Sequence, residues 1–172
     1  MQTKTVRQLV VFMLRKGIRK LKTIGITDKI DFPEVMLLDL PCKIDTGADT
    51  SAIHCERIRI KEINGKDHLV FKLLDKTHPH YTGKDIITDQ FKEKKVKSSF
   101  GDYEFRYQVK LRMVLFGTKY LVSFNLSNRK NMKYPVLIGR KFLSRKYLVD
   151  VSQADSSAKM KLEKNENRSI KS

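Results

Sequence analysis

An all-β domain is the fold class that the sequence predicts, on two observations. Short runs of the chain alternate apolar with basic residues, as in 56–63 and 109–115, and a period of two is that of a strand with one buried face. Turn residues separate such runs, and Asn64-Gly65 and Gly117-Thr118 mark two hairpins. The 172 residues, 40% of them hydrophobic, suffice for one domain with its own core.

The expected strands follow one another with short connections. They lie at 24–27, 35–40, 42–44, 56–63, 68–74, 94–99 and 103–114, and a further hairpin pairs 111–116 with 120–124. Loops are expected at 28–33 and at 76–90, where Pro79 and Gly83 interrupt the pattern.

The net charge of +17 is unevenly distributed along the chain. Residues 1–22 carry seven Lys or Arg and no acidic residue, so we take them as a basic N-terminal extension. It is either an amphipathic helix that contacts a membrane surface or RNA, or sequence upstream of a later start at Met13. The folded domain is placed at 23–151, with a net charge of +8. A disordered polar tail is expected at 152–172, because apolar residues are scarce there.

No apolar run approaches the roughly 18 residues that a membrane-spanning helix needs. The run Leu9–Leu14 is shorter than the roughly 7–15 residues of a secretory signal, and no cleavage site of small residues follows it, so we expect a cytoplasmic protein. There Cys42 and Cys55 are expected as buried free thiols, although they could also pair. The charge favours a polyanionic partner such as ribosome, RNA or an acidic peptide, or else reflects a generally basic surface.

The stretch with the most chemical content is 42–54, where a short apolar run ends in Asp-Thr-Gly-Ala. Backbone donors can hold a carboxylate just past the end of a strand, and a glycine next to it lets a substrate approach closely. Asp45 is therefore the candidate catalytic residue. The rest of the candidate active-site loop is Thr46, Gly47, Ala48, Thr50 and Ser51.

The string Lys-Ile-Asp-Thr-Gly-Ala-x-Thr-Ser-Ala-Ile-His at 43–54 resembles the active-site loop of retropepsin-like aspartic peptidases. It is most similar to the branch long catalogued as "ATP-dependent zinc proteases". Two further islands, 96–106 and 129–150, follow in the family's order, so the resemblance covers about 22–151. It implies an acid-protease barrel with one short C-terminal helix at 141–145 and a final strand at 147–150. The family's apolar-apolar-Gly element, which packs beside the catalytic loop, corresponds to Leu137, Ile138 and Gly139.

The resemblance also implies a mechanism. Aspartic peptidases hold two carboxylates around one water, and the two share a proton because like charges some 3 Å apart cannot both ionise. The chain has one Asp-Thr-Gly, so each copy of a homodimer would supply its Asp45 at a two-fold axis, with Thr46 bracing the pair.

A retropepsin needs a flap over its substrate, and we expect it at the hairpin tip around 98–102. An ordinary surface hairpin is the alternative. Two arginines are expected either to bind an acidic side chain or to pair with Asp49, Glu104 or Asp150. The candidate flap and substrate-binding residues are Ser98, Ser99, Gly101, Arg106 and Arg140.

The zinc and the ATP of the family's older name have no matching motif in the chain. It contains neither His-Glu-x-x-His nor Gly-x-x-x-x-Gly-Lys-Ser/Thr, and we expect neither a metal nor another cofactor. His78-Pro79-His80 lacks a clear third ligand. His54 is expected to pack beside the loop rather than to act in catalysis, although that role stays open.

Two functions from different classes are compatible with these residues. The first is a homodimeric aspartic endopeptidase. Family members are linked to ATP-grasp ligases that add glutamates to ribosomal protein tails, which implies an acidic, glutamate-rich peptide as the substrate. The alternative is a non-catalytic retropepsin-fold module that binds nucleic acid or ribosome through its basic surface. The intact Asp-Thr-Gly-Ala favours the peptidase, because a binding module has no need of the Asp.

Overall fold

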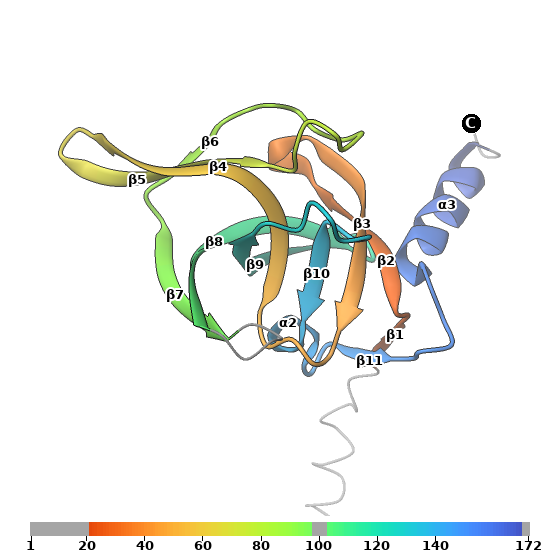
Figure 1. The fold of residues 1–172 in the computed structure, drawn as a ribbon. Coiled ribbons are helices and arrows are strands. Elements are labelled where there is room, and N and C mark those ends of the chain that lie inside the picture. Colours follow the sequence, from red (N-terminus) through yellow and green to blue (C-terminus); the bar gives the residue numbers. More distant parts are fainter. Residues whose placement is uncertain (1–20, 98–102, 170–172) are drawn as a thin grey trace, which may run out of the picture.

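The computed structural model describes residues 21–97 and 103–169 of the chain (Figure 1). The strands are β1 (Lys22–Ile24), β2 (Thr27–Phe32), β3 (Leu37–Asp45), β4 (Ser51–Ile63), β5 (Lys66–Leu73), β6 (Ile86–Thr88), β7 (Phe91–Lys97), β8 (Tyr103–Leu115), β9 (Thr118–Ser127), β10 (Val136–Gly139) and β11 (Tyr147–Val149). The helical segments are the 3₁₀ turn η1 (Pro33–Val35), α2 (Arg140–Leu143) and α3 (Ser156–Ser169). The predicted all-β fold is confirmed, and α2 is the short helix expected near 141–145.

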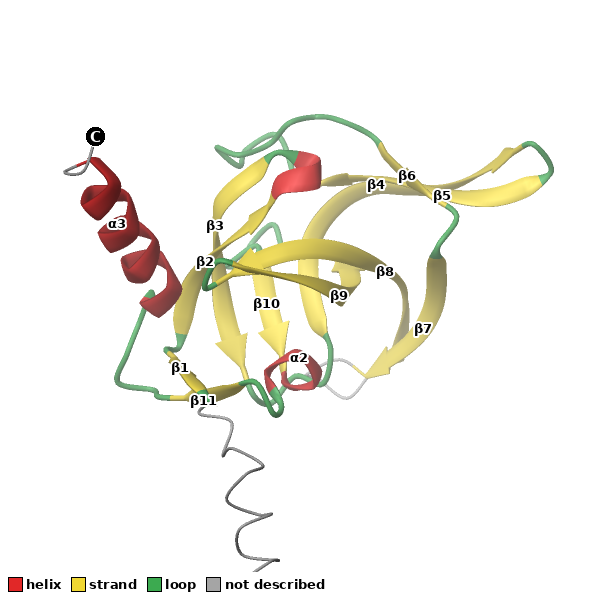
Figure 2. Cartoon of the chain, turned by 180° about the vertical axis from the view of Figure 1, so that it is seen from behind, coloured by secondary structure: helices red, strands yellow, loops and turns green. Residues whose placement is uncertain are grey.

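A closed ring of strand pairings forms the barrel. From β3 the hydrogen-bonded order runs through β2, β8 and β9 to β4. Strand β10 closes the ring, because it pairs parallel with β3 and antiparallel with β4. Figure 2 shows this ring from behind, with β10 between β3 and β4. A closed barrel removes the free strand edges that an open sheet exposes.

Two hairpins have tight turns with left-handed residues, the β4–β5 hairpin and the β8–β9 hairpin. Asn64 and Gly65 both have positive φ, 53° and 73°, as a type I′ turn between β4 and β5 requires. In the β8–β9 turn the left-handed residues are Phe116 and Gly117, one position earlier than the expected Gly117-Thr118. The β4–β5 hairpin projects away from the barrel in Figure 1.

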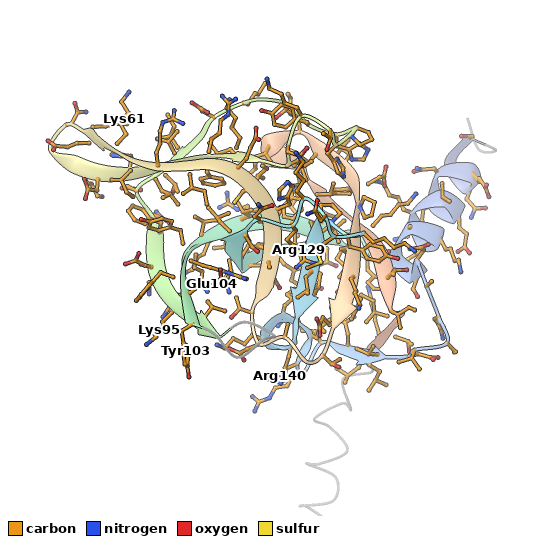
Figure 3. All side chains as sticks on the ribbon, viewed as in Figure 1. Lys61, Lys95, Tyr103, Glu104, Arg129 and Arg140 are labelled. Carbon is orange, nitrogen blue, oxygen red and sulfur yellow. The ribbon has the colours of Figure 1, made fainter. Side chains whose placement is uncertain are left out.

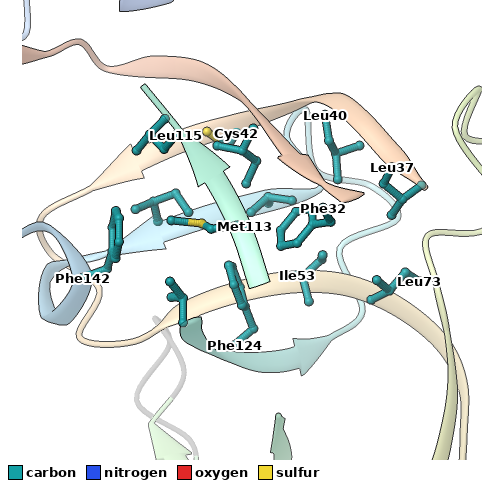
Figure 4. Packing of buried hydrophobic residues seen from close by; sticks show 14 of the residues in the cluster. Phe32, Leu37, Leu40, Cys42, Ile53, Leu73, Met113, Leu115, Phe124 and Phe142 are labelled. Atoms are coloured by element: carbon teal, nitrogen blue, oxygen red, sulfur yellow. The ribbon is translucent and has the colours of Figure 1, made fainter. Parts of the chain in front are cut away.

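The core fills the barrel with side chains from alternate positions of facing strands (Figure 4). The rings of Phe32 on β2 and Phe124 on β9 meet edge to face, with centroids 5.5 Å apart, and Met113 on β8 is fully buried. The alternation in β3 is interrupted at Asp39, which has a φ of 53° and lies where the β2–β3 register shifts. Asp tolerates this left-handed conformation better than most residues do.

The expected loop at 28–33 and the disordered tail at 152–172 are both wrong in the structure, for a shared reason. Residues 27–32 form β2, in which Asp28 takes a core-facing position and is only 1% exposed. Its carboxylate accepts hydrogen bonds from the backbone N–H groups of Ser157 and Ala158 in the first turn of α3. Lys161 adds ion pairs to Asp31 and Asp39. Polar contacts hold α3 together with an apolar contact of Met160 to the core, so the low hydrophobicity of the helix concealed it.

The described residues contain no helix that is long and apolar enough to cross a membrane. Both cysteines are buried and unpaired, as expected, and burial raises the pKa of the Cys55 thiol to about 12. Residues 1–20 and the hairpin tip at 98–102 lie outside the described part, and with them lie most of the predicted basic extension and the flap residues Ser98, Ser99 and Gly101.

Candidate active site

Asp45 is the last residue of β3, where the strand gives way to the loop 46–50. Its Oδ1 accepts hydrogen bonds from the backbone N–H groups of Gly47, at 2.9 Å, and Ala48, at 3.1 Å. Both hydrogen bonds that the described residues donate to this carboxylate reach Oδ1. Oδ2 is therefore the oxygen available to a water or a second carboxylate. The loop thus fixes the orientation of a half-buried carboxylate, as the sequence predicted.

The end of β10 supports the loop from beneath. Gly139 lies in register with Asp45, and its N–H donates to Oγ of Ser51 at 3.0 Å in a buried hydrogen bond. A Cβ at position 139 would lie 2.6–2.9 Å from backbone atoms of Thr50 and Ser51. Only a glycine lets the two backbones approach so closely. This contact gives the predicted support by Gly139 a geometric basis, whereas Leu137 and Ile138 pair with Lys43 and Ile44 of β3.

The first turn of α2 ties down the far side of the loop. The backbone N–H groups of Arg140 and Lys141 donate to the carbonyl oxygens of Ala48 and Asp49, at 2.8 and 3.0 Å. The side chains of Lys141 and Arg140 also reach the Asp49 carboxylate, at 2.5 and 3.6 Å. The hydrogen bond from Lys141, and then the two positive charges, lower the pKa of Asp49.

A cleft of about 1140 Å³ opens beside this loop. Its walls come from the loop 45–50, from β7, β8 and β9, and from the region around α2. Two carboxylates, those of Asp45 and Asp49, face a larger number of cationic side chains. The cationic residues that line the cleft are Lys94, Lys95, Arg106, Arg129, Lys141 and Lys146. The cleft is therefore electropositive around its carboxylates.

The two predicted substrate arginines lie in different places. Arg106, on β8, lines the cleft and also forms an ion pair with Glu104. Arg140 begins α2, and its side chain points away from the barrel in Figure 3, where it pairs with Asp49. Arg106 thus forms the ion pair considered for it and also lies at the cleft, and Arg140 forms the ion pair with Asp49 that was its alternative role.

Arg129 is one of the cleft residues that the sequence did not predict. It follows the end of β9, and Figure 3 shows it near β10 and β4. Its backbone N–H donates to Nδ1 of His54 at 2.9 Å, and its Nε donates to the carbonyl oxygen of Tyr134 at 3.2 Å. Its position at the start of the 129–150 island was the one signal that marked it.

His54 is buried, with 4% of its surface exposed, and both nitrogens of its imidazole ring are in hydrogen bonds. Nε2 lies 2.8 Å from Oδ2 of Asp75, and Nδ1 accepts from Arg129. A backbone N–H can only donate, so Nδ1 is unprotonated and Nε2 carries the proton toward the carboxylate. Hydrogen bonds from Thr77, and then the one from His54, hold the pKa of Asp75 well below its ordinary value.

The described residues do not supply the set of ligands that a zinc ion needs. The rings of His78 and His80 lie with centroids 5.4 Å apart, but His78 Nδ1 accepts the backbone N–H of His80. Within residues 21–97 and 103–169, no group of three or more His, Cys, Asp or Glu side chains is placed to hold a metal ion.

Comparison with known proteins agrees with this geometry. A family model described as RimB-like, the retropepsin-like aspartic endopeptidase RimB, matches residues 24–160. The chain belongs to this family. The match includes the Asp45 loop, β10 and the first turn of α3.

Relatives and a solved structure extend the comparison. A probable α-L-glutamate ligase from Shewanella pealeana is 33% identical over 135 residues, which are 76% of this chain and 29% of the ligase. Another from Desulfotalea psychrophila is 26% identical over 75% of this chain and 28% of the ligase. The chain thus spans less than a third of the length of these relatives. The crystal structure of Lpg0085, a protein of unknown function from Legionella pneumophila, superposes with a TM-score of 0.56 at 26% identity and covers 79% of this chain and 98% of that one.

Proposed function

We propose that the chain is an aspartic endopeptidase that acts as a homodimer, with Asp45 of each copy at the two-fold axis. The observation that carries the proposal is the Asp45 carboxylate, held through Oδ1 by two backbone N–H groups at the edge of an open cleft. One carboxylate takes a proton from the water that attacks the peptide carbonyl. The other, protonated, donates to the carbonyl oxygen.

The proposed second copy supplies a carboxylate that the cleft of one chain lacks, because the other acidic residue lining the cleft, Asp49, is already in ion pairs. Asp49 also lines the cleft, but Lys141 and Arg140 stabilise its charged form and lower its pKa. A carboxylate held ionised cannot serve as the proton donor of the pair. Asp45 is in none of the ion pairs of the described residues, and repulsion between two such carboxylates brought close together would favour one shared proton.

We propose further that the substrate is an acidic, glutamate-rich peptide. The cleft beside Asp45 is lined by six Lys or Arg side chains, which attract and orient carboxylates. In the relatives, a segment similar to this chain belongs to longer proteins named as probable α-L-glutamate ligases. A hydrolase that removes glutamates is the natural counterpart of such a ligase activity.

The test compares wild type with Asp45→Asn on glutamate-rich and glutamine-rich peptides over a range of enzyme concentrations. Asp45→Asn keeps the size of the side chain and removes the acid–base group. We expect cleavage of the acidic peptide by wild type alone, with a specific activity that rises with enzyme concentration. Asp49→Asn is the matched control from the same loop, and it should retain cleavage. Equal activity of Asp45→Asn and wild type would overturn the proposal.

A non-catalytic module that binds nucleic acid or ribosome is the second candidate, because the same electropositive cleft would attract phosphates. It predicts tight, salt-sensitive binding of RNA that Asp45→Asn leaves unchanged. Absence of peptide cleavage by a verified dimer, together with such RNA binding, would favour this candidate over the peptidase.

A further inference from the structure

We propose that Arg129 and Arg106 form a carboxylate-binding subsite in the cleft, which takes an acidic side chain of the substrate, and that His54 is the positioning residue for Arg129. This inference rests on the proposed function for the nature of the substrate, a peptide. It assigns the acidic preference to one pair of side chains.

Two hydrogen bonds hold Arg129, one through its backbone and one through its side chain. Its backbone N–H is bonded to His54, and its Nε to the carbonyl oxygen of Tyr134. These bonds fix the residue while leaving the Nη groups of its guanidinium to the cleft that Arg129 lines. A fixed guanidinium loses little conformational entropy when it binds a carboxylate through two parallel N–H bonds.

The charge of this arginine has no ion-pair partner among the described residues, and Asp45 is the acidic residue that partly offsets it. None of the ion pairs among the described residues includes Arg129, although its side chain is half-buried. Burial, and then the neighbouring charge of Arg106, lower the pKa of Arg129, and Asp45 acts in the opposite direction. A half-buried cation next to a second cation is costly unless an anion joins them. A carboxylate of the substrate would supply that anion.

The position of Arg106 extends the site along the path of a peptide. Arg106, whose side chain is 25% exposed, lines both the main cleft and an adjoining hollow of about 540 Å³. Ser127 and Asn128 also line both spaces. The hollow has cationic and acidic side chains in its lining, namely Arg57 and Lys130 with Glu56, Asp75 and Glu104. An extended peptide that runs from Asp45 into the hollow would pass the arginine pair.

The lining of the cleft favours an acidic peptide over single-stranded RNA. Proteins that bind single strands combine basic grooves with exposed aromatic rings on which bases stack. Among the residues that line the cleft the rings are those of Tyr120 and Phe142, which pack against each other at 5.1 Å, with Phe142 buried. Phe142 is therefore not open to a base, and the Tyr120 ring is engaged by Phe142; the exposed ring of Phe105 lines the adjoining hollow and not the main cleft.

His54 transmits its own position to the arginine. Its imidazole is held by Asp75 through Nε2, and this leaves Nδ1 as an acceptor aimed at the N–H of Arg129. Removal of the imidazole would free the backbone at position 129 and let the guanidinium move. His54 thus acts on the arginine through the backbone N–H of Arg129, and as a buried residue at the edge of the hollow it is a positioning residue.

The test uses the full chain with Asp45→Asn as background, so that binding is measured without cleavage. Fluorescence anisotropy would give the Kd of a labelled glutamate-rich peptide and of the same peptide with Gln in place of every Glu. We expect Arg129→Gln and Arg106→Gln each to weaken binding of the Glu peptide by about tenfold or more, and to change binding of the Gln peptide less than about twofold. Lys164→Gln, which removes the same charge from exposed α3, should alter neither Kd.

Two further variants isolate geometry from charge. Arg129→Lys keeps the charge but loses the planar fork, so its preference for the Glu peptide should lie between those of wild type and Arg129→Gln. His54→Ala should lower the same preference, and Arg129→Gln in that background should lower it little further. If His54 were merely structural, the folded fraction would fall while the preference of the folded protein stayed the same.

The proposal would be overturned if Arg129→Gln weakened both peptides equally, if Lys164→Gln matched its effect, or if oligouridylate bound better than the Glu peptide through the same arginines. Selective binding without any cleavage by the protein with Asp45 restored would refute the peptidase and leave the subsite standing. Selective cleavage that Arg129→Gln does not affect would refute only the subsite.

Discussion

Replacement of Gly139 by alanine tests the contact between β10 and the catalytic loop. The backbone at this position, with φ −87° and ψ 167°, is open to any residue, so conformational strain is not the cause of any effect. The added Cβ would instead meet backbone atoms of Thr50 and Ser51 at 2.6–2.9 Å. Backbone cannot swing aside as a side chain can, so β10 and the loop must separate.

The expected cost follows from three terms. Overpacking costs about 1–3 kcal/mol. Loss of the buried bond from the Gly139 N–H to Ser51 Oγ adds about 1–2 kcal/mol. The reduced freedom of alanine in the unfolded chain offsets about 0.4–1 kcal/mol. Gly139→Ala should therefore lower the free energy of unfolding by about 1–4 kcal/mol, measured by urea denaturation.

Ser51→Ala is the matched control, because it removes the hydrogen bond and adds no atom. It should cost less than Gly139→Ala, and the double variant should cost less than the sum, since both act on the same bond. Gly139→Ala should also reduce peptide cleavage in the fully folded protein, because the loop that holds Asp45 is displaced. An unfolding free energy within about 0.5 kcal/mol of wild type would refute this account of the contact.

Three other perturbations have outcomes that the structure predicts. Asp28→Ala removes the acceptor of two backbone N–H groups of α3, so the helix should detach, with faster amide exchange across 156–169 and unchanged exchange in the barrel. His54→Ala leaves the N–H of Arg129 without its buried acceptor and the Asp75 carboxylate with only its hydrogen bonds from Thr77, and it should cost about 1–3 kcal/mol, which thermal unfolding would detect. The lowered pKa of Asp75 contributes stability that is present above about pH 4 and is lost as pH falls toward the folded-state pKa. Asp75→Asn should flatten this acid dependence, and an unchanged profile would contradict it.

The catalytic loop could be predicted from sequence because its determinants are local. Asp45, Gly47 and Ala48 lie within four residues, and their hydrogen bonds join neighbours in the chain. The strand periods and turn residues of the hairpins are local as well. The all-β class followed from these patterns, whereas the family and its barrel were implied by the resemblance of 43–54 and of the two later islands.

The loop expected at 28–33 and the disorder expected at 152–172 were predicted wrongly because a buried polar side chain, Asp28, stands where an apolar residue is usual. Asp28 occupies a core-facing position of β2, and its burial depends on a helix more than a hundred residues away. Period-two alternation therefore did not mark the strand, and hydropathy did not mark the helix. Arg129 was missed for a similar reason. The parallel pairing of β4 with β9 sets His54 opposite Ser127, and only this long-range register places Arg129 next to the imidazole.

The most direct test of the central claim, that Asp45 of two copies forms one site, is a mixing experiment. Wild type and Asp45→Asn would be combined at constant total concentration, allowed to exchange subunits, and assayed on a glutamate-rich peptide. If each site needs an Asp45 from both copies, mixed dimers are inactive and the rate follows the square of the wild-type fraction. A rate that is linear in the wild-type fraction would show that one Asp45 suffices, and would contradict the shared site.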